Sequence, residues 1–597
     1  MRRGGRSFRS LSNLVQVGRC HPAKRSLWRI GANSMWIFEF GLSRRRPSRS
    51  SRQMGSALLA AAVLLFCPTA QAQWATYRGD TARTGAPASV DQGIYTLAEL
   101  QKLRVDAQWQ LPPLIDQTAP PRSRGFWSSP VVHGDRLFIG GGSGVFYAFD
   151  RYTLKQLWQY PRAEETPLTS QFTCNPSSFG IASSAAIAQV HGRDAVIFGA
   201  PDRSMGAGLG DGRLFALDVE TGEPIWKSGT LAPITGLSKL NEAMNDQELA
   251  KAFEETHQQI GYSAPLVAND KVYVGIANHC DNPIQAGSVK AVRLSDGSPE
   301  PNFSFEAASP RGGGIWSSLA SDGTDIYATT GNIRGGLRPG DQILSNHALA
   351  LLRLDGLTGS LRWKLQPVPV ELDDDPDWAA GATITKSSCG TVALSTMKDG
   401  WTYAVRAEPS NQGDVDVAWQ YPPTGFPFTS TDNWTEHGDT RFLRSGLSWN
   451  DTFVTMAGGL NINVKKISNY TRLHAFNLCS SPEQRLRWIF DVPRTTPGEP
   501  YSLGVPSGRG GFIFIGTRSG WLVVLADPSI EPPSGYRCEH PDVETPICTQ
   551  FGFRLVPDPK VVTEVQLQGA ISGEPVLTTD RVYVATTAGY LYALRAD

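Results

Sequence analysis

Two short phrases in the middle of the chain hold side chains with clear chemical uses. Gly312-Gly313-Gly314-Ile315-Trp316 ends in an indole, a flat apolar ring that offers a large stacking area. Cys280-Asp281-Asn282 contains a carboxylate, whose hard anionic oxygens suit calcium. Each phrase also has a plainer interpretation, since Trp316 could belong to an ordinary core and Asp281 to a solvated loop.

Several other chemistries lack the residues that they require. The nine His are scattered without metal-ligand spacing, and no Cys-x-x-Cys-His occurs, so we expect no covalently attached haem in this chain. Gly206, Gly208 and Gly210 lack the strand-turn-helix context of a nucleotide-binding loop.

The elements that would position these side chains form an internal repeat. Two strand-like runs separated by turn residues lead to an alternating strand that ends in Asp-x-x-Thr-Gly, and a Trp-bearing strand follows. Such units must stack, and radial closure leaves few open sheet edges. We therefore predict an all-β fold, an eight-bladed β-propeller of four-stranded blades. The eight copies begin near Trp127, Ser183, Ser263, Trp316, Gly381, Ser445, Gly504 and Gly573.

The two ends of the chain are predicted to close the ring together. The last copy stops at Leu594 without a fourth strand, and Val105–Trp109 resembles the Trp-bearing strand of the other copies. Pairing of the N- and C-terminal strands would complete the eighth blade. The Trp residues of the other blade ends are expected to pack between neighbouring blades: Trp158, Trp226, Trp363, Trp419 and Trp488.

The N-terminal part of the chain differs from the repeat. Residues 1–53 hold 13 Lys and Arg and one acid. We interpret them as an unstructured basic extension, or as residues upstream of the true translation start at Met54. A nucleic-acid-binding arm is the alternative. Residues 54–72 end in Ala-x-Ala and predict a secretory signal cleaved before Gln73, which implies a periplasmic or secreted protein. Residues 73–597 would form one propeller, with insertions near 231–260 and 530–558.

Charge and cysteine content restrict the partners of the exported chain. The first 72 residues take 13 basic residues and one acid from a chain with 56 of each, which leaves a net charge of −12 and disfavours nucleic acid. The remaining cysteines suit an oxidising compartment, with Cys538 and Cys548 as the expected pair. The apolar run of the signal is too short for a bilayer span, so we do not expect an integral membrane protein.

The repeated Asp-x-x-Thr-Gly-x-x-x-Trp and the phrase WATYRGDTARTGA from Trp74 resemble the quinoprotein alcohol dehydrogenase-like propellers, over roughly residues 74–597. The resemblance implies pyrroloquinoline quinone (PQQ) on the axis, a Trp beneath it and a calcium or lanthanide ion at its edge. It implies hydride transfer from an alcohol, small or polymeric, while an acidic residue takes the proton. Electrons would leave to a separate acceptor, such as a cytochrome or a quinone.

The same resemblance assigns roles to particular residues. Trp316 would be the floor of the quinone site, and the turn Lys398-Asp399-Gly400 would contact the quinone oxygens. Asp281 and Asn332, the latter in Thr330-Gly331-Asn332, would bind the metal ion.

Asp377 is the candidate catalytic base, in an acidic segment that resembles the one carrying the catalytic Asp. If this segment is aligned with that of the family at Trp378, Ala379 takes the position of the catalytic Asp. If it is aligned at Ala380-Gly381, Trp378 takes that position. Asp377 is the nearest acid in both alignments. A calcium-binding loop or a solvated turn is the alternative interpretation.

One departure from the family keeps a second hypothesis open. The enzymes place a disulfide of adjacent cysteines above the quinone, and this chain has no adjacent pair. The alternative is a non-catalytic propeller that binds proteins or polysaccharide in the cell envelope, of the outer-membrane assembly type. The Trp phrase, the Gly-Asn and the basic turn, in that order, favour the enzyme.

Overall fold

The structure of the protein is a computed structural model. The structure describes residues 74–87, 95–112, 125–171, 178–204, 206–238, 244–278, 284–309, 311–332, 345–367, 377–378, 380–398, 401–409, 414–421, 445–457, 460–461, 466–467, 472–494, 504–539 and 545–596. All of them belong to one compact unit, Ala70–Asp597. The predicted extension 1–53 and signal 54–72 lie outside the described residues.

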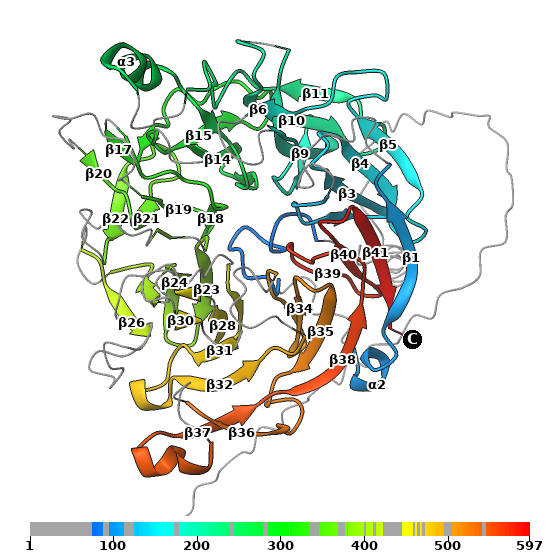
Figure 1. Cartoon of the computed structure of the whole chain (residues 1–597), viewed down its shortest axis with the longest axis vertical. Coiled ribbons are helices and arrows are strands. Elements are labelled where there is room, and N and C mark those ends of the chain that lie inside the picture. Colours follow the sequence, from blue (N-terminus) through cyan, green and yellow to red (C-terminus); the bar gives the residue numbers. More distant parts are fainter. Residues whose placement is uncertain are drawn as a thin grey trace, which may run out of the picture. The chain divides into compact units, whose positions relative to one another are not determined.

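Alternating hydrophobic runs and turn residues form eight four-stranded antiparallel sheets, which follow one another around a centre (Figure 1). Each sheet, called a blade here and numbered along the chain, has its first strand innermost and its fourth outermost. Blade 1 contains β2 (Val131–His133), β3 (Arg136–Gly140), β4 (Phe146–Asp150) and β5 (Gln156–Tyr160), and blade 2 contains β8 (Ala186–Val190), β9 (Arg193–Asp202), β10 (Asp211–Asp218) and β11 (Pro224–Lys227). Blade 3 contains β13 (Leu266–Ala268), β14 (Lys271–Asn278), β15 (Ser288–Arg293) and β16 (Phe305–Glu306), and blade 4 contains β18 (Ala320–Ser321), β19 (Ile326–Thr329), β21 (Leu351–Leu354) and β22 (Leu361–Leu365).

The second half of the ring repeats this arrangement. Blade 5 contains β23 (Thr383–Ser387), β24 (Gly390–Thr396), β25 (Thr402–Arg406) and β26 (Val417–Tyr421), and blade 6 contains β27 (Leu447–Trp449), β28 (Thr452–Ala457), β31 (Arg472–Asn477) and β32 (Leu486–Asp491). Blade 7 contains β33 (Ser507–Arg509), β34 (Phe512–Gly516), β35 (Trp521–Ala526) and β38 (Lys560–Gln566), and blade 8 contains β39 (Val576–Leu577), β40 (Val582–Ala585), β41 (Tyr590–Arg595) and β1 (Arg104–Gln110).

Shorter elements decorate the blades. Strand pairs form between β6 (Ser170–Gln171) and β7 (Ser178–Phe179), β17 (Ala308–Ser309) and β20 (Ser345–Asn346), β29 (Leu460–Asn461) and β30 (Lys466–Ile467), and β36 (Gly535–Cys538) and β37 (Leu555–Asp558), while β12 (Gln258–Gln259) pairs with β14. The helical elements among the described residues are α2 (Leu97–Leu100), α3 (Asp246–Glu254), η3 (Pro482–Gln484) and η4 (Thr545–Phe551). Within the described part of the chain, no helix has the length and apolar character needed to cross a membrane.

The two ends of the chain close the ring, as predicted. Strand β1 pairs antiparallel with β41, with Trp109 opposite Leu591 and Val105 opposite Leu594 (Figure 1). An ion pair between Asp106 and Arg581 also ties β1 to the turn between β39 and β40 of the same blade. The prediction of an eight-bladed, all-β propeller closed by its terminal strands is therefore confirmed.

The hydrophobic core lies between the faces of neighbouring blades. Phe146 of blade 1 stacks on Phe198 of blade 2 with ring centroids 4.0 Å apart. The Trp residues of the outer strands extend the contact, since the indole Nε1 of Trp158 donates to Val219 O of the next blade at 3.1 Å, and that of Trp226 donates to Leu294 O at 2.9 Å. The predicted packing of these Trp residues between blades is confirmed. The remaining ones behave alike: Trp363 donates to Ala407 O, Trp488 to Asp527 and Trp419 packs on Phe476.

Residues 74–87, which follow the predicted signal, lie at the centre of the ring (Figure 1). Their carbonyl oxygens accept hydrogen bonds from the innermost strands of six blades. The buried residues Arg78 and Arg83 contact the two remaining blades. The segment thereby contacts all eight blades. The backbone donors are Val132, Ile187, Ser321, Ile384, Ser448 and Gly508, Arg83 donates to Pro265 O of blade 3, and Glu574 of blade 8 accepts from Arg78.

Two disulfides join described residues. Cys538 and Cys548 are bonded, which confirms the predicted pair. Cys389, in the β23–β24 turn of blade 5, is bonded to Cys479, which follows β31 of blade 6. The second bond therefore connects neighbouring blades.

Candidate functional site

Four of the residues predicted for the site lie at one edge of blades 4 and 5. Trp316 precedes the first strand of blade 4 and Asn332 follows its second strand, β19. Asp377 precedes the first strand of blade 5 and Lys398 follows its second strand, β24. Because the first two strands of a blade are antiparallel, the start of one and the end of the other lie at the same edge.

Asp377 connects the other two chemical groups of this edge. Its Oδ1 lies 2.7 Å from Lys398 Nζ, and its Oδ2 accepts a hydrogen bond from Trp316 Nε1 at 3.2 Å. Asp377 is 3% exposed, and the Lys398 side chain is 12% exposed. The backbone N–H of Lys398 also donates to Asp377 O at 3.1 Å. The ammonium and the indole N–H compensate the hydration that this carboxylate loses on burial.

Lys398 and Trp316 also face each other directly. Lys398 Nζ lies 6.0 Å from the centroid of the Trp316 ring, at the outer limit of a cation–π contact. Trp316 is half-buried, so part of its ring remains accessible. The three side chains thus present a flat ring, a cation and a carboxylate within one cluster, which we call the blade 4–5 cluster (Trp316, Asp377 and Lys398).

The glycines around Trp316 allow the segments of blade 4 to approach closely. Gly331 N–H donates to Gly314 O at 2.8 Å, and Gly313 N–H donates to Asn332 O at 2.7 Å, so Asn332 lies beside the Trp316 segment. Gly313 has a φ of +68°, a conformation that favours glycine. A Cβ at Gly331 would lie 3.4 Å from Asp377 Oδ2, in contact with the carboxylate. This explains the Gly-rich phrases on both sides of the cluster.

Hydroxyl groups position the backbone next to the cluster, and the sequence analysis did not identify them. Ser317, next to Trp316, shares a hydrogen bond of 2.6 Å with Thr329 Oγ1. Thr329 Oγ1 and Ser395 Oγ both donate to Ala380 O, at 3.1 and 2.9 Å, in the segment that carries Asp377. The sequence does contain a signal for these hydroxyl groups, because a Ser directly follows an aromatic residue in several repeat copies.

The structure does not test every predicted site residue. Asp281, Asp399 and Gly400 lie outside the described residues. The segment 244–260 contains α3 and β12, and β12 pairs with the end of β14, the strand that leads toward Asp281. Near this end His257 Nε2 lies 3.5 Å from Glu255 Oε2, and burial lowers the pKa of His257 in spite of that carboxylate.

The blade 4–5 cluster fits the quinone-binding part of a PQQ site better than the metal-binding part. Its half-buried indole and its ammonium suit a flat ring system with anionic oxygens. For a metal ion the fit is less complete, because the described residues contain no group of three or more His, Cys, Asp or Glu that could hold one. Asn332 is the only predicted metal ligand among them, and Asp281 is the other predicted ligand.

Comparisons with known proteins agree with the fold. Residues 74–408 match the family described as the beta-propeller domain of PQQ glucose/ethanol/alcohol dehydrogenases. No curated protein matches the chain in sequence.

Solved structures are similar in fold at low identity. Quinohemoprotein alcohol dehydrogenase from Comamonas testosteroni is 16% identical, with a TM-score of 0.58 over 88% of this chain and 80% of that one. A europium-containing methanol dehydrogenase is 14% identical, with a TM-score of 0.58 over 88% of this chain and 98% of that one. Quinohemoprotein alcohol dehydrogenase ADHIIG from Pseudomonas putida HK5 is 14% identical, with a TM-score of 0.54 over 88% of this chain and 80% of that one. Since the family match covers more than half of the sequence, the chain belongs to the PQQ glucose/ethanol/alcohol dehydrogenase β-propeller family.

Proposed function

We propose that the protein is a PQQ-dependent alcohol dehydrogenase that acts in the periplasm or outside the cell. The observation that carries the proposal is the convergence of Asp377, Lys398 and Trp316 at one edge of blades 4 and 5. These residues are separated by up to 82 positions in the sequence, and each was assigned to the quinone site by resemblance alone.

Each member of the cluster has a role that follows from its chemistry. The Trp316 ring supports a flat cofactor by stacking, and Lys398 stabilises negative charge that develops on the cofactor oxygens. Asp377 accepts the proton of the substrate hydroxyl, within hydrogen-bond reach. The bound quinone supplies the hydride acceptor.

The Asp377–Lys398 ion pair also bears on the role of Asp377 as the base. An ammonium at 2.7 Å favours the ionised carboxylate, which is the form that can accept a proton. A substrate hydroxyl that binds beside Asp377 would approach Oδ1 or Oδ2. These two oxygens already contact Lys398 Nζ and Trp316 Nε1. Proton transfer therefore requires the substrate to share the carboxylate with these donors.

The remaining parts of the proposal rest on the sequence. Calcium would be bound by Asp281 and Asn332, and the electrons would leave to a separate acceptor such as a cytochrome or a quinone. The substrate is an alcohol, small or polymeric. Export depends on the signal at residues 54–72.

A binding titration tests the proposal. Purified protein is titrated with PQQ and calcium, and the quenching of Trp fluorescence is followed together with reduction of an artificial dye by alcohols. We expect saturable binding that Trp316→Ala abolishes. Trp449→Ala is the matched control, because Trp449 is also half-buried but ends the first strand of blade 6, at the opposite edge of the ring. Absence of saturable binding, or an equal loss in both variants, would overturn the proposal.

The missing pair of adjacent cysteines favours one other function, a non-catalytic propeller that binds proteins or polysaccharide in the cell envelope. This alternative predicts that the protein neither binds the quinone nor reduces the dye, and that envelope proteins or polysaccharide are retained on the immobilised chain.

A further inference from the structure

Aromatic residues recur at one position in three of the first four blades. Trp127 lies four residues before β2 and Tyr262 lies four residues before β13. Trp316 of the blade 4–5 cluster has the same spacing from β18. By the strand direction argued above, all three lie at the same edge of their blades. In blade 2 the equivalent residue is Ala182, four residues before β8.

Phe179 of β7 bridges the gap that Ala182 leaves. Its ring centroid lies 6.2 Å from that of Trp127 and 6.3 Å from that of Tyr262, so the three rings form a row from blade 1 to blade 3. Phe179 is buried, Trp127 is half-buried and Tyr262 is 38% exposed. We call Trp127, Phe179 and Tyr262 the aromatic row. Ser318, two residues after Trp316, contacts the carbonyl of Tyr262 at 3.5 Å, so the row approaches the blade 4–5 cluster.

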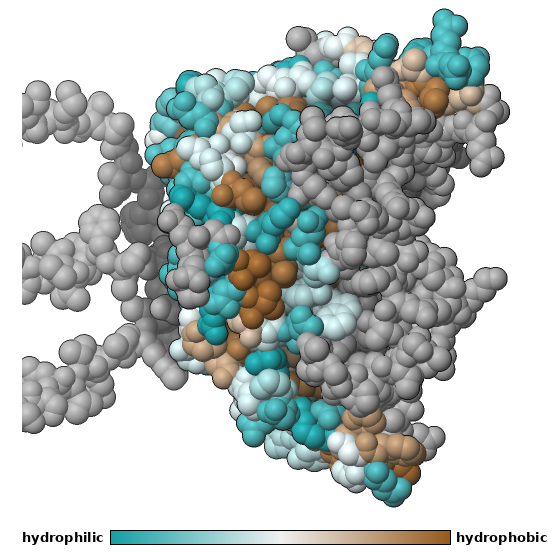
Figure 2. Space-filling view, turned by 90° about the vertical axis from the view of Figure 1, so that its left-hand side faces the viewer, coloured by the Kyte–Doolittle hydropathy of each residue, from teal (hydrophilic) through white to brown (hydrophobic). Residues whose placement is uncertain are grey.

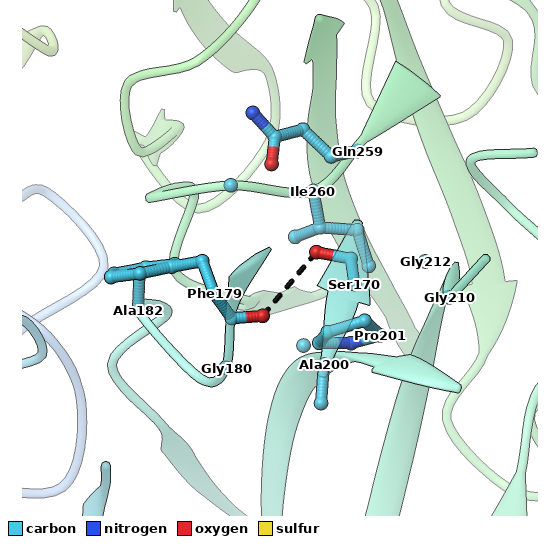
Figure 3. Close-up of a pocket in the computed structure, with 12 residues that line it drawn as sticks. Ser170, Phe179, Gly180, Ala182, Ala200, Pro201, Gly210, Gly212, Gln259 and Ile260 are labelled. Carbon is cyan, nitrogen blue, oxygen red and sulfur yellow. Dashed lines mark hydrogen bonds between the residues drawn. The ribbon is translucent and has the colours of Figure 1, made fainter. Parts of the chain in front are cut away.

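A small cavity opens beside the row, at the position where blade 2 lacks an aromatic ring. Its volume is about 20 Å³, and Figure 3 shows Ala182 and Gly180 on one side, Gln259 and Ile260 above and Ser170 opposite. Gly261, next to Tyr262, also lines it. A space of this size accommodates one water molecule, and therefore one hydroxyl group.

The polar groups of the cavity suit a hydroxyl. Ser170 Oγ donates to Phe179 O at 3.3 Å, which leaves its oxygen lone pairs to accept a further hydrogen bond. The amide of Gln259 can both donate and accept. The glycines bring backbone groups close, since a Cβ at Gly210 would lie 2.6 Å from Ser170 Cα.

We infer that the aromatic row and this cavity bind an oligosaccharide chain. A pyranose ring has an apolar C–H face and a rim of hydroxyls, so it stacks on an accessible ring such as Tyr262 while one hydroxyl enters the cavity. Neither element carries a charge, which suits a neutral ligand. On the side of the molecule that Figure 2 shows, the coloured hydrophobic residues form separate groups among hydrophilic ones.

The inference does not depend on quinone binding, because no residue of the aromatic row belongs to the blade 4–5 cluster. If both proposals hold, the row binds one part of a saccharide whose hydroxyl reacts near Asp377. If only the inference holds, the propeller binds saccharide without oxidising it.

Calorimetric titration of the full mature chain without quinone, with cellohexaose and maltohexaose as probes, tests the inference. We expect at least one hexasaccharide to bind, Tyr262→Ala to weaken it at least tenfold, and Tyr262→Phe to keep affinity within about twofold because the ring remains. Ala182→Leu should weaken binding at least tenfold by filling the cavity. Tyr536→Ala is the matched control, since Tyr536 is an exposed Tyr on β36, outside the row.

Melting temperatures of all variants must lie close to that of the unchanged protein, and Tyr262, being exposed, is a safe position for substitution. The inference is overturned if neither hexasaccharide binds at millimolar concentration, or if Tyr262→Ala and Tyr536→Ala bind equally well. Failure of PQQ binding in the separate fluorescence titration would leave these results unchanged.

Discussion

Asp377 precedes and Lys398 follows the β23–β24 hairpin, and their side chains meet with Asp377 Oδ1 2.7 Å from Lys398 Nζ. The hairpin itself therefore creates the contact, since antiparallel pairing brings its two ends together. Trp316 reaches the same carboxylate from the neighbouring blade. The site is thus a product of blade-to-blade packing as well as of local strand pairing.

Replacing the candidate base tests its chemical role. Because Asn cannot accept the proton, we expect Asp377→Asn to lower dye reduction with alcohols by about 10²- to 10⁴-fold in the presence of PQQ and calcium. Quinone binding by fluorescence should persist, since Trp316 and Lys398 remain. Asp416→Asn is the control, because Asp416 pairs with Arg406 on the surface of the same blade. Unchanged activity in Asp377→Asn would exclude this residue as the base.

The central segment should contribute strongly to stability through one buried ion pair. Arg78 and Glu574 side chains are 0% exposed, and Arg78 Nη1 lies 3.2 Å from Glu574 Oε2. Glu574→Gln leaves a buried guanidinium without its counter-charge, so the free energy of unfolding should fall by about 3–5 kcal/mol in urea denaturation.

A second Glu→Gln change provides the comparison. Glu564 pairs with the half-exposed Arg494 at 3.5 Å, and Glu564→Gln should cost less than about 1 kcal/mol. Equal effects of the two substitutions would show that the central segment does not depend on this ion pair.

The parts of the fold that repeat along the chain were predictable from the sequence. The Trp158 and Trp226 strands, the eight copies and the closing strand at Val105–Trp109 each follow a local pattern that occurs several times. Cys538 and Cys548 were predictable because they lie 10 residues apart in one insertion. A short loop leaves few geometric alternatives.

Features that occur only once were not predictable in the same way. The phrase from Trp74 served only as a sign of the family, and nothing in it shows that Arg78 and Arg83 occupy the centre of the ring. Their partners are largely backbone carbonyls, including Pro506, Gly446 and Leu319, which any sequence supplies. The resemblance assigned Trp316, Asp377 and Lys398 to one site, but not the shared carboxylate that joins them. Tyr262 was overlooked because its partners come from other blades.

The two disulfides should differ in their effect on stability. Cys389–Cys479 closes a segment of 90 residues between two blades, whereas Cys538–Cys548 closes one of 10. Chain entropy then predicts a loss of about 4–5 kcal/mol for the Cys389→Ser, Cys479→Ser double variant, against about 2–3 kcal/mol for Cys538→Ser, Cys548→Ser. Urea denaturation of both double variants measures the difference. The reverse order would mean that strain or residual structure outweighs loop closure.

His474 should make the stability of the protein depend on pH. The residue is buried in β31, beside Tyr421 and Phe476, and burial lowers its pKa to about 3, with a smaller contribution from Arg472. In the unfolded chain a His has a pKa near 6.5. Between about pH 6.5 and about pH 3, His474 is therefore protonated in the unfolded state and neutral in the folded state. The free energy of unfolding consequently falls as the pH falls through this window. Above pH 6.5 this group adds no pH dependence.

Urea denaturation between pH 4 and pH 8 measures this effect. His474→Gln removes the titrating group, so the decline in stability below about pH 6.5 should become less steep than in the unchanged protein. His191→Gln is the control, because His191 is exposed in the β8–β9 turn, and it should leave the slope as it is. A slope that is the same in His474→Gln and in the unchanged protein would show that other groups, such as the buried carboxylates, govern the acid sensitivity. A steeper slope would mean that His474 binds its proton more readily in the folded than in the unfolded state, which is opposite to the effect expected of a buried His beside Arg472.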